Sequence, residues 1–116
     1  MIARYWRGWT TAENADRYEQ IVSTEVLPSI AARRFVGYLG SYLLRRTVGD
    51  EVEFATIMHF ESIDAVRAFA GEDYETAYVP PRAREVLARF DAKSVHYEML
   101  VTPADGTQWP RPSRDA

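Results

Sequence analysis

The segment EVEFATIMHF (residues 51–60) constrains the fold most, because it predicts a β-strand that is apolar on both faces. Successive side chains of a strand point to opposite sides of the sheet. One side of this strand has Phe54, Thr56, Met58 and Phe60, and the other has Ala55, Ile57 and His59. Both faces therefore need a cover, whereas an open sheet in a single domain leaves one face in water. The sequence therefore predicts that a second subunit covers the face that the rest of the same chain leaves open.

The other segments place this strand in a β-α-β-β-α-β order. Strands are expected at residues 2–9, 36–48, 51–60 and 93–101, with Gly49-Asp50 as the turn of a hairpin. Helical regions are expected between residues 10 and 30, where apolar residues recur every four positions, and after Ser62 and Pro81. This order predicts an α+β, ferredoxin-like fold with an antiparallel sheet.

Local signals set the expected limits of the helices. Thr10 and Glu13 have the spacing of a capping box at the start of the first helix. Pro28 lacks an amide donor and predicts a kink or a restart within that helix. The last helix is expected to extend over residues 81–90, with Arg89 on its outer side.

Composition sets the class of protein and argues against several partners. The chain of 116 residues fits one domain, expected over residues 1–102, and the polar, proline-rich residues 103–116 are expected to form a flexible tail. A net charge of −3 gives no electrostatic reason to expect nucleic acid or an anionic membrane as a partner. The chain has no cysteine, no apolar signal region and no apolar run of membrane-spanning length, which favours a cytoplasmic location.

Four stretches in this order resemble one known family: YLGSYLLRR, EFATIMHFESIDAVRAFAG, DYETAYVPPRAREVLARFD and VHYEML. They are similar to the antibiotic biosynthesis monooxygenase family of the dimeric α+β barrel superfamily, over about residues 2–101. The resemblance implies a homodimer whose two sheets pack face to face, with a pocket between the helices and the sheet of each subunit. Members of this family include cofactor-independent oxygenases of aromatic polyketides, haem-degrading enzymes and enzymes that act on small signalling molecules.

The resemblance also implies positions for site residues, and this chain differs at each of them. The Trp that commonly ends the third strand of such proteins corresponds to Phe60, and the Asn of the first strand corresponds to Tyr5 or Trp6. The iron-binding His of the haem-degrading members corresponds most nearly to Tyr78. These differences argue against haem degradation, although a tyrosinate is able to ligate iron.

Aromatic residues dominate the expected site. We expect a pocket for a planar aromatic substrate, with the substrate-binding residues Trp6, Phe60, Phe69, Tyr74 and Arg82 and the catalytic candidates His59 and Tyr78. Arg4, Arg7 and Arg82 are the candidates to hold a phenolate or a carboxylate.

The two histidines each have two interpretations. His59 is either a general base near pH 7, a common role of histidine, or a residue of the subunit interface. If Phe60 faces the pocket, alternation sends His59 to the other face. His96 forms either a proton-transfer pair with Glu98 or part of a half-exposed polar strand edge. Their spacing predicts no metal site, and we expect no bound cofactor.

The function predicted from the sequence is a small cofactor-independent monooxygenase that oxidises an aromatic or polyketide-like substrate with dioxygen. The alternative is a dimer that binds haem or a small aromatic compound without turnover. A third interpretation is a dimer whose cavity is filled by its own side chains, with Met58, Phe60 and Phe69 closing the space between helices and sheet.

Overall fold

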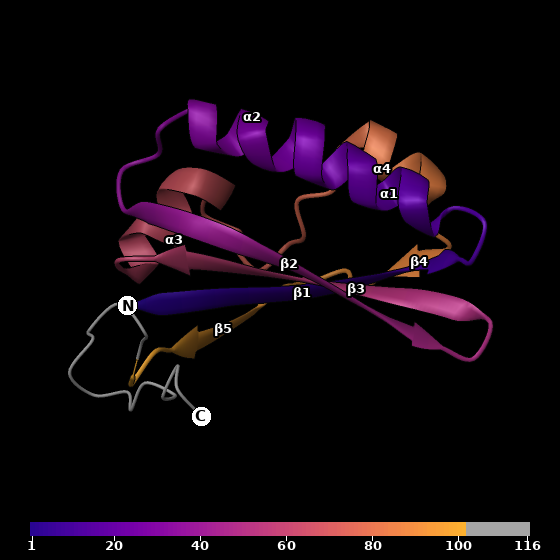
Figure 1. Cartoon of the computed structure of the whole chain (residues 1–116). Coiled ribbons are helices and arrows are strands. Elements are labelled where there is room, and N and C mark those ends of the chain that lie inside the picture. Colours follow the sequence, from indigo (N-terminus) through magenta and orange to yellow (C-terminus); the bar gives the residue numbers. More distant parts are fainter. Residues whose placement is uncertain (102–116) are drawn as a thin grey trace, which may run out of the picture.

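In the computed structural model, which describes residues 1–101, helices cover one face of an antiparallel β-sheet (Figure 1). The chain forms β1 (Ile2–Thr11), α1 (Ala15–Ile21), η1 (Val22–Val26), α2 (Leu27–Ala32), β2 (Tyr38–Val48), β3 (Glu51–Phe60), α3 (Ile63–Ala70), α4 (Pro81–Val86), β4 (Arg89–Phe90) and β5 (Val95–Glu98). None of these helices is long and apolar enough to cross a membrane. The tail predicted at residues 103–116 lies outside the described residues.

The sheet has the strand order β2-β3-β1, and β4 and β5 share the remaining edge of β1. Every strand pair is antiparallel. Together, β4 and β5 occupy the place of a single fourth strand. The predicted ferredoxin-like α+β fold is therefore confirmed.

The fourth strand is interrupted, so the prediction of one strand over residues 93–101 is wrong in its limits. On this edge of β1, strand pairing is limited to β5 and the two residues of β4. Between them, Ser94 N donates to Glu75 O at 2.7 Å, and Ala77 N donates to Ala92 O at 3.0 Å. The segment that joins α3 to α4 thus competes with β1 for these backbone groups.

The same edge shortens the last helix. α4 ends at Val86, and the prediction that it continues to Phe90 is wrong. The backbone of Arg89 and Phe90 pairs with Trp9 and Gly8 of β1. Strand pairing with a nearby sheet edge has replaced the last turn that the sequence pattern predicted.

The first helix begins later than the predicted capping box. Thr10 lies within β1, where it is fully buried and paired with Val52 of β3. Asn14 occupies the N-cap position instead. The capping-box prediction is wrong because β1 remains paired with β3 as far as Thr11.

Pro28 does not end the long helix, because the helix widens before it. Leu27 N donates to Val22 O, five residues back, and η1 is a π-helical turn. Pro28 then lies in the first turn of α2, where its lack of an amide is tolerated. The predicted restart of the helix near Pro28 is therefore present, as the π-helical turn η1 followed by α2.

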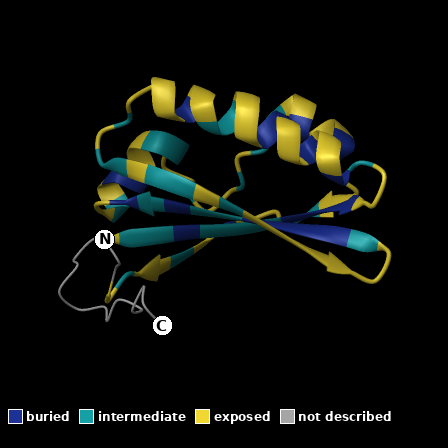
Figure 2. Ribbon diagram, viewed as in Figure 1, coloured by how far each residue is buried: buried dark blue, intermediate teal, exposed yellow. Residues whose placement is uncertain are grey.

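Buried residues concentrate where the helices meet the sheet (Figure 2). On this side of β3, Phe54 and Phe60 are fully buried. On the opposite face, four large side chains are about half exposed: Tyr42, Leu44, Val95 and Tyr97. Nothing within residues 1–101 covers this second face, which we call the open face.

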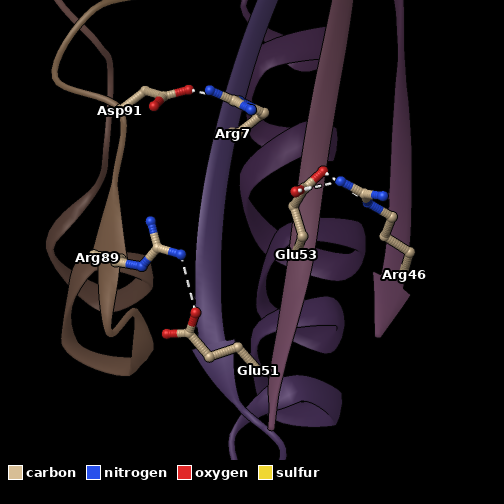
Figure 3. A network of polar contacts seen from close by, with 6 residues as sticks. All are labelled: Arg7, Arg46, Glu51, Glu53, Arg89 and Asp91. Carbon is tan, nitrogen blue, oxygen red and sulfur yellow. Dashed lines mark hydrogen bonds and ion pairs between the residues drawn. The ribbon is translucent and has the colours of Figure 1, made fainter. Parts of the chain in front are cut away.

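Three ion pairs lie at one end of the open face (Figure 3). They are Arg7–Asp91 at 3.0 Å, Arg46–Glu53 at 3.1 Å and Arg89–Glu51 at 3.0 Å. Partly exposed pairs of this kind contribute about 0.2–1 kcal/mol each. Their main consequence is that the open face has a charged end and an apolar end.

Candidate functional site

A cavity lies between the helices and the covered face of the sheet. Its aromatic lining is Trp6, Tyr18, Phe69 and Tyr78. Its aliphatic wall includes Val22, Val26 and Ile30, and its polar lining includes Arg4, Thr56 and Ser94. The π-helical turn η1 thus forms part of the wall.

The cavity is small in this structure. The space open to the centre of a water-sized sphere is about 50 Å³. This is room for roughly three to five water molecules, whereas pockets for drug-sized ligands measure about 300–1,000 Å³. A ring-sized ligand therefore enters only when part of the wall moves.

Trp6 is held in one orientation on the sheet side of the cavity. Its indole Nε1 donates to Asp91 O at 2.7 Å. Its ring is tilted against Phe90, with 6.1 Å between the ring centroids. Both partners belong to the interrupted fourth strand, so the break in that strand helps to position Trp6.

Phe69 and Tyr78 form the opposite aromatic corner of the cavity. Their rings meet edge to face, with 5.6 Å between centroids. Tyr78 is 48% exposed and stands where the cavity meets solvent. Phe60 is fully buried behind Phe69, with 5.7 Å between centroids, and supports the wall without lining the cavity.

Arg4 is the charged residue of the lining, and only 3% of it is exposed. Its guanidinium donates to Tyr74 O, to Thr76 O at 3.0 Å and to His96 Nε2 at 3.0 Å. Burial lowers the pKa of Arg4 to about 10, so the group remains charged at pH 7. Arg4 and Trp6 are two residues apart on one strand, so the sequence already indicates that their side chains share a face of β1.

Tyr18 brings a phenol from α1 to the cavity and was not among the predicted site residues. Its ring is tilted against Phe54, with 4.7 Å between centroids. Burial raises the pKa of the Tyr18 phenol above its usual range. Tyr18 therefore keeps its proton and is suited to donate a hydrogen bond rather than to accept a proton.

Besides Phe60, three predicted site residues do not line the cavity. His59 lies on the open face, where its ring is 5.2 Å from that of Tyr42. Tyr74 contributes its carbonyl oxygen to Arg4, and its ring packs on His96. Arg82 lies outside and forms an exposed ion pair with Glu25 at 3.2 Å.

His96 meets Arg4 rather than its strand neighbour Glu98. Because a guanidinium has no acceptor, Arg4 donates and His96 Nε2 accepts, which places the ring proton of the neutral tautomer on Nδ1. Burial lowers the pKa of His96, the Arg4 charge lowers it further, and Glu75 opposes both. His96 is therefore neutral at pH 7.

The residues of the cavity do not fit a porphyrin. No histidine is among the lining residues, and the free space is that of a few water molecules. Residues 1–101 also contain no cluster of three or more histidine, aspartate or glutamate side chains able to hold a metal ion.

The chain matches no protein-family model and no curated protein sequence. Solved structures of similar shape do exist. A mutant of MhuD, the haem degrader of Mycobacterium tuberculosis, carries two manganese protoporphyrin IX molecules in each active site. It is 20% identical at a TM-score of 0.61, over 88% of this chain and 97% of that chain.

Two further solved structures resemble the chain as well. A Bacillus cereus protein with a provisional antibiotic biosynthesis monooxygenase name is 12% identical at a TM-score of 0.60, over 88% of this chain and 94% of that chain. SnoaB, a cofactor-independent oxygenase from Streptomyces nogalater, is 19% identical at a TM-score of 0.53, over 87% of this chain and 95% of that chain. The chain therefore has the α+β fold that these two proteins share with the haem degrader MhuD.

Proposed function

We propose that the protein is a small cofactor-independent monooxygenase that oxidises an aromatic substrate in the cavity between helices and sheet. The observation that carries this proposal is the lining itself, in which aromatic rings surround one buried cation, Arg4. The likeness in fold to SnoaB supports the same reaction class. Such a reaction needs an enclosed apolar site and a means to stabilise a substrate anion.

The proposed reaction requires no external reductant. A ring carbon that bears two hydrogens loses a proton, and the resulting anion supplies the electrons that reduce dioxygen. One oxygen atom forms a carbonyl on that carbon, and the other leaves as water with the two hydrogens. The protein contributes orientation by Trp6, Phe69 and Tyr78, exclusion of water and stabilisation of charge.

Substrate entry requires the segment between α3 and α4 to move. Tyr78, Val79 and Pro80 of this segment line the cavity, and Tyr78 is half exposed. The segment contains no helix or strand, and Arg4 holds it through the carbonyl oxygens of Tyr74 and Thr76. Loop motions of this type commonly admit substrate and then exclude water.

The proposed enzyme is a homodimer joined through the open face. Ala55 is buried and Ile57 partly buried there, and both are surrounded by the half-exposed side chains of the neighbouring strands. A second copy buries this apolar area, and the ion pairs at the charged end restrict its orientation. In this arrangement His59 is an interface residue and not the base.

Oxygen uptake tests the oxidation. We expect the wild-type protein to consume one dioxygen per molecule oxidised, across a panel of anthrones whose reacting ring carbon bears two hydrogens, faster than the buffer alone. Tyr78→Ala should lower the rate about ten-fold or more by opening the cavity to water. His59→Ala should change it less than about two-fold, because His59 lies on the other face. No uptake above the buffer rate across the panel excludes the monooxygenase.

A second candidate is a binding protein without turnover. It is favoured by one observation, namely that no side chain lining the cavity is suited to accept a proton at pH 7. His59 and His96 are not in the lining, and the pKa of Tyr18 is raised. Saturable binding of an aromatic compound without oxygen uptake would support this candidate instead.

A further inference from the structure

Arg4 is a buried charge that has no counter-ion within residues 1–101. Its contacts are two backbone carbonyl oxygens and His96, which is neutral. Every ion pair among residues 1–101 belongs to another arginine. Burial alone lowers the pKa of Arg4, with no carboxylate to offset it. Buried charges in proteins are normally paired, so this cation is an exception that calls for a function.

The guanidinium also has unused donors. It carries five N–H groups in a planar fork, and all five are hydrogen-bond donors. The carbonyl oxygens of Tyr74 and Thr76 and the Nε2 atom of His96 use three of them. Two N–H groups, one on Nε and one on Nη2, have no partner among the described residues. A fork with free donors and an unbalanced charge matches an anionic oxygen group.

The surroundings of Arg4 select an aromatic anion over a free inorganic one. The guanidinium carbon lies 5.6 Å from the centroid of the Phe69 ring. Trp6, two residues along the same face of β1, lines the cavity beside it. An anion that also carries a planar ring is therefore able to meet Arg4 and both aromatic side chains at once.

We propose that Arg4 binds an anionic oxygen group of the cavity's aromatic ligand, a carboxylate or an ionised phenol. The inference rests on the proposed function for the aromatic part of the ligand. For the proposed substrate, loss of the ring-carbon proton gives an anion whose charge is shared with a conjugated ring oxygen, and contact with Arg4 favours this anion, which is the electron-rich form that reacts with dioxygen. The proton passes to solvent, so the cavity needs no base of its own.

The test uses 4-nitrophenol, whose ionised form is yellow, and its methyl ether 4-nitroanisole, which has nearly the same shape and no charge. With wild-type protein, the bound phenol should ionise at a lower pH than the free phenol. Its anion should bind about thirty-fold tighter than the ether. This measurement needs no variant and does not depend on turnover. A benzoate and benzamide pair repeats the comparison for a carboxylate.

Variants then assign the effect to Arg4. Arg4→Met should abolish the preference for the anion over 4-nitroanisole, which is read as the ratio of the two affinities in the same variant. Arg4→Lys, which keeps the charge and loses the fork, should retain part of the preference. The matched control is Arg45→Met, which removes a cation that pairs with Asp16 and Glu19 outside the cavity, and it should behave as wild type.

The outcomes separate this inference from the proposed function. If the ether and the anion bind equally, or the bound phenol ionises at a higher pH than the free one, Arg4 does not bind an anion and the aromatic cavity still stands. If neither compound binds, the aromatic cavity and the anion site both fail. If the anion binds as expected but no substrate consumes oxygen, the anion site stands and the monooxygenase fails.

Discussion

The indole of Trp6 lies directly above Gly8, in space that any side chain on Gly8 would occupy. A Cβ atom built on Gly8 would be 2.9 Å from the Cη2 atom of Trp6 and 2.9 Å from Leu87 Cδ2. Both distances are shorter than ordinary contacts between carbon atoms. The flat position of Trp6 on the cavity wall therefore requires a glycine two residues further along β1.

Gly8→Ala should destabilise the protein and displace Trp6. Because the added methyl group overpacks a filled site, we expect a loss of about 1–3 kcal/mol in the free energy of unfolding. The hydrogen bond from Trp6 Nε1 to Asp91 O should weaken at the same time. Urea unfolding measures the first effect, and a weaker affinity for 4-nitroanisole reports the second.

The control for this prediction is the same substitution in a Trp6→Ala background. Of the three atoms nearest to the methyl group, only Leu87 Cδ2, the end of a flexible side chain, remains there, so Gly8→Ala should cost clearly less. An equal cost in both backgrounds would show that Trp6 does not depend on Gly8.

Much of the fold was predictable because it follows from short-range periodicity. Alternation along β3 separates Phe54 from Ala55, and the four-residue spacing from Tyr18 marks the buried side of the long helix. Gly49, with a φ of 62°, supplies the left-handed turn expected between β2 and β3. Each of these features is decided by neighbours a few residues away.

The rest depended on contacts between distant parts of the chain. Arg4 meets Thr76, and Trp6 meets Asp91, across more than seventy residues of sequence. No local pattern indicates that residues 72–80 cross the covered face and interrupt the fourth strand. The backbone partners that hold Arg4 and Trp6 were therefore missed, whereas Arg4 itself and aromatic lining residues such as Phe69 were among the expected candidates.

His96 makes the stability depend on pH. The pKa of His96 is lowered in the folded protein from its ordinary value of 6.5. As the pH falls below 6.5, the unfolded chain therefore binds a proton at His96 more readily than the folded chain does. The stability that His96 contributes should therefore be fully present above that pH and be lost as the pH falls below 6.5 and through the lowered pKa of the folded protein. The groups that face His96 are Arg4 and Glu75, with the Tyr74 ring packed on it.

His96→Gln checks this assignment by urea unfolding between pH 5 and pH 7.5. Glutamine does not titrate and is able to accept from Arg4, so the slope of stability against pH should flatten. The change at pH 7.5 should cost no more than about 1.5 kcal/mol, the value of one hydrogen bond. A variant with the wild-type slope would mean that another group causes the pH dependence.

Ile57→Glu should break the proposed dimer. Ile57 lies in the apolar part of the open face, beside Ala3, Tyr5 and Tyr97. A carboxylate there would be buried without a partner, which costs several kcal/mol. Light scattering should give twice the chain mass of 13.3 kDa for the wild type and the chain mass itself for the variant.

Val36→Glu is the matched control for the dimer, because Val36 is 83% exposed and precedes β2. It should leave the mass of the wild type unchanged. A wild-type protein that is monomeric at every concentration tested would refute the dimer. A variant Ile57→Glu that remains dimeric would place the interface elsewhere.

A hemin titration should show no specific binding. A porphyrin is far larger than the free space of about 50 Å³, and the nearest candidate ligand, Tyr78, is half exposed at the cavity mouth. Absorbance should rise in proportion to added hemin, without a saturable Soret band, and Tyr78→Phe should give the same curve. A saturable band that shifts in Tyr78→Phe would instead place that phenolate on the iron, because a tyrosinate is a known haem ligand. The cavity would then open much further than this structure shows, and haem binding would replace aromatic oxidation as the function.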